Sequence, residues 1–103
     1  MPKIHFLTGP RAGESLTLGT GLWTLGRAPD NAVVIREQTV SARHCELLVR
    51  GPRVAIRDLG ARNGTFVNGA SAVGGLSDVP PGSRVRLGAV ELQVLEDPLR
   101  TPT

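Results

Sequence analysis

Three short polar segments of the chain carry side chains suited to the recognition of an anion. They are the pair Gly26-Arg27, the segment 41–44 and the segment 60–65. Together they offer guanidinium groups, a hydroxyl, a carboxamide and backbone N–H groups freed by glycine. Arginine forks and clustered backbone N–H groups are common phosphate donors, and a carboxamide can both donate to and accept from a peptide. This set predicts binding of a phosphate next to a peptide backbone.

The same residues give little support to catalysis. Ser41 and His44 lack a third partner and a Gly-x-Ser-x-Gly elbow. The glycines at 60–64 are not followed by the lysine of a P-loop. Asp58 is interpreted as a brace for the loop after it, through Asx-type hydrogen bonds. We expect no catalytic residue and predict that the chain is not an enzyme.

The chain also lacks the side-chain spacing of a metal site. Cys45 is the single cysteine, and the adjacent His44 and the distant His5 do not supply a ligand pattern. Cys45 alternates with Leu47 and Val49, which favours a buried core position over a reactive thiol. We expect no metal and no cofactor.

The scaffold that positions these segments is predicted to consist of strands. The length of 103 residues corresponds to one domain, and 13 glycines and 8 prolines leave little room for helices. Short segments with period-two alternation, separated by turn signals about every 8–12 residues, are typical of an antiparallel β-sandwich. The predicted strands are 3–8, 15–18, 22–25, 32–35, 44–49, 54–58, 66–67, 84–87 and 90–95.

The remaining segments are predicted as turns, loops and a tail. Asn68-Gly69 predicts a type I′ turn. Residues 71–82, with three glycines and two prolines, are predicted to be one long connection. The domain is predicted to span residues 1–96, with little or no helix. Residues 97–103 have no periodicity and are expected to be a flexible tail or linker.

Charge and hydropathy argue against nucleic acid and membrane partners. The net charge is +3 at pH 7, and acidic residues interrupt every basic cluster, unlike the basic stripe of duplex-binding proteins. Aromatic residues for base stacking are scarce. No apolar run approaches the roughly 18 residues of a membrane span, and the first residues do not resemble a signal peptide. We expect a cytoplasmic protein that binds neither nucleic acid nor membrane.

The three segments occur in a recognisable order and spacing. The matching residues are Leu25-Gly26-Arg27, Ser41-Ala42-Arg43-His44 and the run Asp58-Leu59-Gly60-Ala61-Arg62-Asn63-Gly64-Thr65-Phe66-Val67-Asn68-Gly69. In this respect the chain resembles the forkhead-associated (FHA) domain family, and the resemblance extends from Lys3 to about Glu96. It implies a β-sandwich of about eleven strands whose loops at one end bind phosphothreonine peptides.

The resemblance also implies roles for individual residues. Arg27, Ser41, Ala42 and Arg62 would hold the phosphate, Ala42 through its backbone N–H alone. Asn63 would bind the main chain of the peptide beside the phosphothreonine. The residues that would shape and brace the loops are Gly26, His44, Asp58, Gly64, Thr65, Asn68 and Gly69.

Two positions depart from the family pattern. Ala42 stands where members often carry a polar or basic side chain, and Ala61 stands where serine is common. Both departures predict weaker binding of the phosphate, for which Arg43 and Arg62 are candidates to compensate.

Two functions follow as hypotheses. The first is a phosphothreonine-dependent module, monomeric as an isolated domain, that recruits a protein or peptide phosphorylated by a Ser/Thr kinase. The second is a scaffold with the same fold that binds a protein without phosphate, through a sheet face. The presence of Arg27, Ser41 and Asn63 favours the first, and the alanines at 42 and 61 leave the second open.

Overall fold

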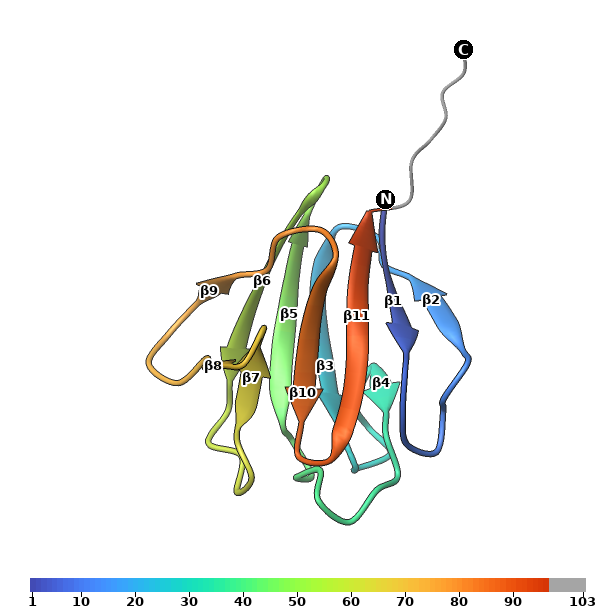
Figure 1. Ribbon diagram of the computed structural model, residues 1–103, viewed down its shortest axis with the longest axis vertical. Helices are drawn as coiled ribbons and strands as arrows, with labels where there is room; N and C mark the ends of the chain where they lie inside the picture. Colours follow the sequence, from blue (N-terminus) through green and yellow to red (C-terminus); the bar gives the residue numbers. More distant parts are fainter. Residues whose placement is uncertain (97–103) are drawn as a thin grey trace.

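Two β-sheets packed face to face form the protein (Figure 1), in a computed structural model that describes residues 1–96. The strands are β1 (Pro2–Phe6), β2 (Ser15–Thr17), β3 (Gly21–Gly26), β4 (Val33–Val34), β5 (Cys45–Arg50), β6 (Arg53–Asp58), β7 (Thr65–Val67), β8 (Ala70–Ser71), β9 (Ser77–Asp78), β10 (Ser83–Leu87) and β11 (Val90–Glu96). One sheet has the order β2-β1-β11-β10-β7-β8 and the other β4-β3-β5-β6-β9. Within residues 1–96 no helix is present, which confirms the predicted sandwich of about eleven strands.

Period-two alternation produces the core between the sheets. In β5, Cys45, Leu47 and Val49 are completely buried, and in β1 the same holds for Ile4 and Phe6. Alternate side chains of a strand point to opposite faces, so each strand contributes every second residue to the interior. The predicted core position of Cys45 is confirmed.

The pairing of β3 with β4 corrects one part of the sequence-based prediction. The other strand pairs are antiparallel, as expected, but β4 runs parallel to β3, with Leu25 opposite Val33 and Gly26 opposite Val34. The chain leaves β3, turns through residues 27–32 and returns in the same direction along its edge. A two-residue strand carries no sequence signal for the direction of its pairing.

The stretch 71–82 also differs from its predicted form. Instead of forming a single connection, it contains Ser71, which belongs to β8, and Ser77–Asp78, which form β9. These strands have two residues each, too few to show an alternation. The predicted type I′ turn is confirmed, since both Asn68 (φ 50°) and Gly69 (φ 86°) have positive φ between β7 and β8.

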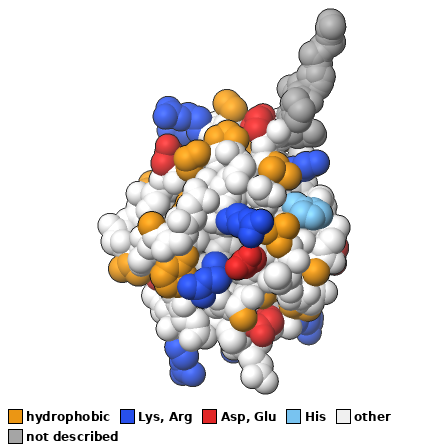
Figure 2. Space-filling model, viewed as in Figure 1, with side chains coloured by type: hydrophobic (Ala, Val, Ile, Leu, Met, Phe, Trp, Pro, Cys, Tyr) orange, Lys and Arg blue, Asp and Glu red, His pale blue; other side chains and the backbone are white. Residues whose placement is uncertain are grey.

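The loops 27–32, 35–44 and 59–64 lie at one end of the sandwich, the lower end in Figure 1. The outer face of the six-stranded sheet, seen in Figure 2, shows basic and acidic side chains interspersed rather than a basic stripe. None of the secondary structure in residues 1–96 provides a helix that could span a membrane. The predicted tail at 97–103 lies outside the described residues.

Candidate functional site

Ser41 connects the three loops at this end. Its carbonyl oxygen accepts a hydrogen bond from the backbone N–H of Arg27 at 3.0 Å. Its Oγ accepts one from the backbone N–H of Arg62 at 3.1 Å, and its own N–H donates to Nδ1 of His44 at 3.0 Å. One residue therefore brings together the segments that the sequence marked separately at 26–27, 41–44 and 60–65.

The exposed arginines of the site are not neutralised by carboxylates. The Arg27 side chain is oriented by a hydrogen bond from Nε to the Val40 carbonyl at 3.1 Å. This bond leaves both terminal NH₂ groups of Arg27 without a hydrogen-bond partner among residues 1–96. Within the same part of the chain, neither Arg27 nor Arg62 has a carboxylate within ion-pair distance. Both guanidinium groups are thus available to an anion.

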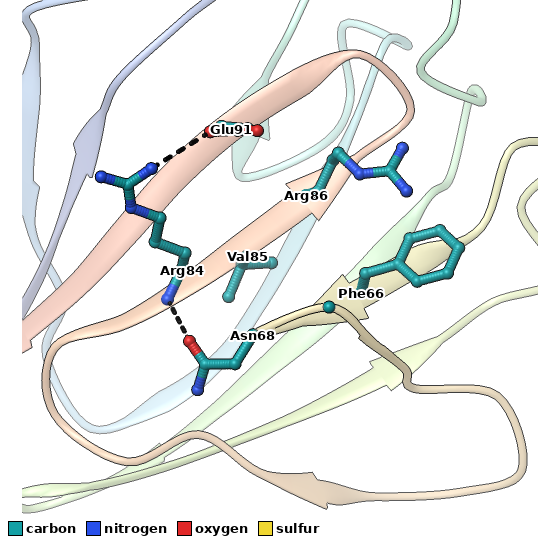
Figure 3. A pocket seen from close by; sticks show the side chains of 7 residues that line it. Phe66, Asn68, Arg84, Val85, Arg86 and Glu91 are labelled. Atoms are coloured by element: carbon teal, nitrogen blue, oxygen red, sulfur yellow. Dashed lines mark hydrogen bonds and ion pairs between the residues drawn. The ribbon is translucent and has the colours of Figure 1, made fainter.

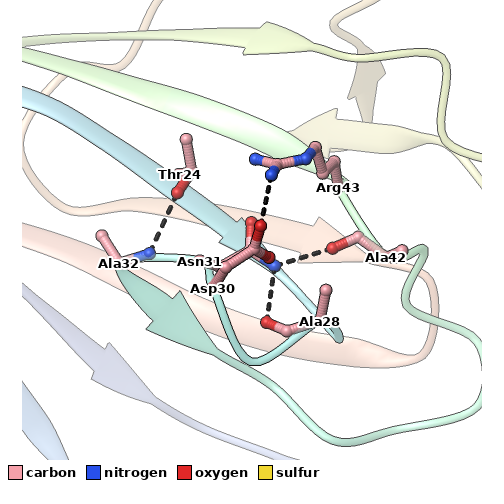
Figure 4. Close-up of polar contacts among 7 residues, drawn as sticks. All are labelled: Thr24, Ala28, Asp30, Asn31, Ala32, Ala42 and Arg43. Atoms are coloured by element: carbon pink, nitrogen blue, oxygen red, sulfur yellow. Dashed lines mark hydrogen bonds and ion pairs between the residues drawn. The ribbon is translucent and has the colours of Figure 1, made fainter.

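Arg43 behaves differently from these two arginines. Its guanidinium forms an ion pair with the carboxylate of Asp30 (Figure 4). The positive charge of Arg43 is already matched within the protein, so Arg43 is not well placed to compensate for the alanine at position 42. Arg62 remains as the candidate.

The backbone carbonyl and the backbone N–H of Ala42 have different roles. Its carbonyl accepts hydrogen bonds from the backbone N–H of Ala28 at 3.2 Å and from Nδ2 of Asn31 at 2.7 Å. Ala42 is exposed, and its N–H donates to no acceptor in the described residues. The carbonyl therefore fixes the loop while the N–H stays free to donate.

Asn63 is held above the loop 35–44. Its Nδ2 donates to the carbonyl of Thr39 at 2.9 Å. Thr39 is fixed in turn by hydrogen bonds to the Glu37 carboxylate and from the N–H of Ala89 at 2.7 Å. The carboxamide oxygen of Asn63 accepts no hydrogen bond within residues 1–96 and can serve a ligand.

His44 is a buried bridge between two loops. Its Nδ1 accepts from Ser41 N–H, so its Nε2 must carry the proton that is donated to the Gly64 carbonyl at 2.8 Å. Only the neutral imidazole with this tautomer makes both bonds. Burial lowers the pKa of His44 below its ordinary value, against the smaller opposing effects of the Gly64 carbonyl and Asp58.

Asp58 shapes the loop 59–64. Its Oδ2 accepts from the backbone N–H of Gly60 at 2.9 Å and of Ala61 at 3.3 Å, as an Asx-type turn requires. Its Oδ1 accepts from the hydroxyl of the buried Thr65 at 2.6 Å. Gly64 adopts φ +81°, a left-handed conformation that favours glycine. These contacts set the path of the segment that carries Arg62 and Asn63.

The role of Asn31 was not apparent from the sequence. Its side chain is 6% exposed and its Nδ2 donates to the carbonyls of Ala28 and Ala42, at 2.8 and 2.7 Å (Figure 4). A Cβ at Gly26 would lie 2.2 Å from the Ala42 oxygen and 2.9 Å from Asn31 Nδ2. Because Gly26 has no Cβ, the backbone of the loop 35–44 can pass at Ala42 directly over the end of β3. The only signal in the sequence for this role is an asparagine in a segment rich in turn-forming residues.

Asn68 and Gly69 do not join the three loops. Asn68 N–H donates to the Arg84 carbonyl at 2.7 Å, and Asn68 Oδ1 accepts from Arg84 N–H at 2.9 Å. The turn formed by Asn68 and Gly69 therefore fastens β7 and β8 to the start of β10. Its contribution to the loops is indirect, through the position of β7.

A cavity of about 480 Å³ lies on the outer face of the six-stranded sheet (Figure 3). It is lined by Phe66, Asn68, Gly69, Arg84, Val85, Arg86 and Glu91. The Arg86 guanidinium lies 4.3 Å from the centre of the Phe66 ring. The hollow is thus on the sheet, whereas the donors described above form an open surface on the loops. Among residues 1–96, no cluster of three or more potential metal ligands occurs.

Comparison with known proteins gives a consistent assignment. The family model described as the inner membrane component of T3SS, cytoplasmic domain, matches residues 5–97. The FHA domain-containing protein FhaB of Mycolicibacterium smegmatis is 35% identical over 84% of this chain and 55% of its own length. The glycogen accumulation regulator GarA of the same organism is 32% identical over 87% of this chain and 56% of its own. The chain thus spans about half the length of these curated relatives.

Two solved structures share most of the fold. One, from a structural and functional analysis of phosphothreonine-dependent FHA domain interactions, has a TM-score of 0.83 and 30% identity, covering 95% of this chain and 98% of that one. The other is the FhaA FHA domain complexed with the intracellular domain of Rv3910, with a TM-score of 0.80 and 28% identity, covering 91% and 99%. The shared sandwich, the matched length and these identities together show that the chain belongs to the forkhead-associated domain family.

Proposed function

We propose that this domain binds a phosphothreonine-containing segment of a partner protein at the three loops joined by Ser41. The observation that carries the proposal is the convergence on Ser41 of Arg27 from one loop and Arg62 from another, at 3.0 and 3.1 Å. These backbone hydrogen bonds hold two residues that carry unneutralised guanidinium groups beside the Ser41 hydroxyl, next to the free N–H of Ala42.

The available donors suit a phosphate. A phosphate monoester carries about −1.5 to −2 charges near pH 7 and three strong acceptor oxygens. The terminal NH₂ groups of Arg27 can form a charged, forked contact. The Ser41 hydroxyl already accepts from Arg62, so its own hydrogen is free to donate. The N–H of Ala42 adds a neutral donor.

Asn63 supplies recognition of the peptide itself. Its Nδ2 is engaged by Thr39 at 2.9 Å, which fixes the plane of the carboxamide and directs the oxygen as an acceptor. An acceptor beside a phosphate site can take the N–H of a residue adjacent to the phosphothreonine. The domain would then read both the phosphate and the main chain that bears it.

This activity is binding, not catalysis. FHA domains act as recruitment modules, and the similar structure noted above comes from phosphothreonine-dependent FHA domain interactions. A Ser/Thr kinase would modify the partner and this domain would then dock it. A contact of this small size is expected to have a Kd on the order of micromolar.

The test is fluorescence anisotropy with a degenerate peptide pool in phosphothreonine, phosphoserine and unmodified threonine versions. The wild-type domain should bind the phosphothreonine pool, and Arg27→Ala should lose most of that binding. Arg43→Ala is the matched control, since it removes the same charge from a residue paired with Asp30. It should retain binding.

Equal binding of all three pools, or no binding by a folded domain, would overturn the proposal. Equal loss in Arg27→Ala and Arg43→Ala would also contradict it, because overall charge rather than a specific site would then be responsible.

A further inference from the structure

The outer face of the five-stranded sheet is arranged in three rows across the strands. In one row, Glu46 lies opposite Arg57, and the two form an ion pair of 2.7 Å. In the next, Leu48 lies between Leu22 and Ala55. In the third, at the end of the β5–β6 hairpin, Arg50 lies opposite Arg53. The rows are therefore a matched charged row, an apolar row and a row of like charges.

The arginine row is uncompensated. Arg50 and Arg53 are both exposed, and neither has a carboxylate within ion-pair distance in the part of the chain that the structure describes. Like charges placed directly opposite on neighbouring strands destabilise a sheet, whereas opposite charges stabilise it. The Glu46–Arg57 pair shows the stabilising arrangement four residues away along each strand, on the same face.

The apolar row remains open to solvent. Leu22 is 57% exposed, and Leu76, just before β9, is 60% exposed. A cavity of about 290 Å³ lies between the apolar and arginine rows, and is lined by Leu48, Arg50, Arg53, Val54, Ala55, Leu76 and Asp78. Apolar side chains and uncompensated arginines thus border the same hollow.

We infer that this face is a second protein-binding surface, which takes an acidic segment of a partner protein and requires no phosphate. Apolar side chains of the segment would cover Leu22, Leu48 and Leu76. A carboxylate of the segment would lie between Arg50 and Arg53 and relieve their repulsion. Asp78 lies opposite Ala55 and also lines the cavity, so its carboxylate would repel an acidic side chain of the segment and favour its placement beside the arginines.

A second copy of the domain is not the expected occupant of this surface. The chain has a net charge of +3, and a symmetric dimer on this face would bring four exposed arginines together. Charge complementarity therefore selects an acidic partner. The surface is on the sheet and shares no residue with the proposed phosphate site, so a variant of either one tests it separately.

The experiment is selection of a phage-displayed library of random 16-residue peptides on the wild-type domain. Selected peptides are synthesised and measured by fluorescence anisotropy against variants. They should be rich in Asp or Glu and in large apolar residues. Leu76→Ser and the double variant Arg50→Gln/Arg53→Gln should each weaken binding at least tenfold, and Arg27→Ala should leave it unchanged.

Two control variants change exposed residues outside the proposed contact. Val73→Ser changes an apolar side chain that is 71% exposed but does not line the cavity. Arg57→Gln removes an arginine that is already paired with Glu46. Both should bind the selected peptides within about twofold of wild type, since removing exposed groups outside the contact has little effect.

The proposal is overturned if no peptide is enriched, if the enriched peptides lack carboxylates, or if they bind Leu76→Ser as well as wild type. Sedimentation velocity provides a further outcome. A concentration-dependent dimer that is abolished by Leu76→Ser would assign the face to a second copy and would likewise overturn an acidic partner.

Discussion

The hydroxyl oxygen of Ser41 accepts a hydrogen bond from the backbone N–H of Arg62, 21 residues further along the chain, at 3.1 Å. Through this contact the loop 35–44 holds the middle of the loop 59–64. The same serine holds the backbone of Arg27 by its carbonyl at 3.0 Å. The geometry of the proposed phosphate site therefore depends on a residue that is also one of its proposed donors.

Ser41→Ala is expected to weaken phosphothreonine-peptide binding about 10- to 100-fold, since a hydrogen bond to a charged group contributes about 1.5–3 kcal/mol. The free energy of unfolding should fall by only about 1 kcal/mol. Anisotropy titration and urea denaturation measure the two effects. Ser15→Ala removes a hydroxyl on β2 that forms a hydrogen bond with His5 on β1, and it serves as control. Unchanged affinity in Ser41→Ala would remove this residue from the site.

Gly26→Ala should destabilise the fold by about 1–3 kcal/mol, because a side chain forced into a filled space displaces the backbone. The added Cβ would meet the Ala42 oxygen at 2.2 Å. Gly19→Ala is the matched substitution, since its Cβ would meet nothing closer than Met1 Cε at 3.7 Å. Thermal unfolding of the two variants compares them directly. If both variants had the same Tm, the predicted steric overlap at Gly26 would be contradicted.

Asn31→Asp is expected to lower the free energy of unfolding by about 3 kcal/mol, since a buried group left without its hydrogen bond costs about 1–3 kcal/mol and a carboxylate more. The new oxygen would face the carbonyls of Ala28 and Ala42, to which Nδ2 now donates. Asp30→Asn, the adjacent exchange, breaks only an exposed ion pair with Arg43 and should cost less than about 1 kcal/mol. Chemical denaturation that ranks the variants in the opposite order would contradict this role for Asn31.

The stability of the domain should decrease as the pH falls from about 6.5, the ordinary pKa of histidine, towards 5.5. The pKa of His44 is lowered by burial, so below this pH the unfolded chain binds a proton that the native state does not. Unfolding is then favoured as the pH falls, and above this range His44 is neutral in both states and contributes no pH dependence.

Urea denaturation at several pH values measures this effect for the wild type, His5→Gln and His44→Gln. The dependence should persist in His5→Gln and be reduced in His44→Gln. NMR of the imidazole nitrogens should also show the Nε2–H tautomer at pH 7.5. A pKa of His44 that is no lower in the native state than in the unfolded chain would refute the assignment. Stability is the appropriate readout because the phosphate of a ligand itself titrates near pH 6.

Cys45 should not react with a thiol reagent in the native protein. Its side chain is fully buried, and burial, reinforced by the nearby carboxylates of Asp58 and Glu46, raises the pKa of the thiol above its ordinary value. The reactive thiolate is therefore scarce and inaccessible. Labelling with 5,5′-dithiobis(2-nitrobenzoic acid) should be complete in 8 M urea and negligible in buffer. Rapid labelling of the folded domain would show that β5 opens.

The sequence was sufficient to predict the class of fold and to propose which loops carry the phosphate site. Alternation in segments such as 44–49 identified strands because one face of each strand is buried. The Asn68-Gly69 pair identified its turn because few residues adopt positive φ. The motifs around Arg27, Ser41 and Asn63 indicated which loops carry the donors.

The tertiary structure determined the features that depend on contacts between distant residues. The parallel pairing of β4, the strand β9 and the role of Asn31 each rest on groups that are far apart in sequence or on elements too short for a pattern. Arg43, which resembles Arg27 and Arg62 in sequence, differs from them because Asp30 lies beside it in the fold. Local order determines which residues form strands and turns, whereas the charge of a site depends on which side chains the packed sheets bring together.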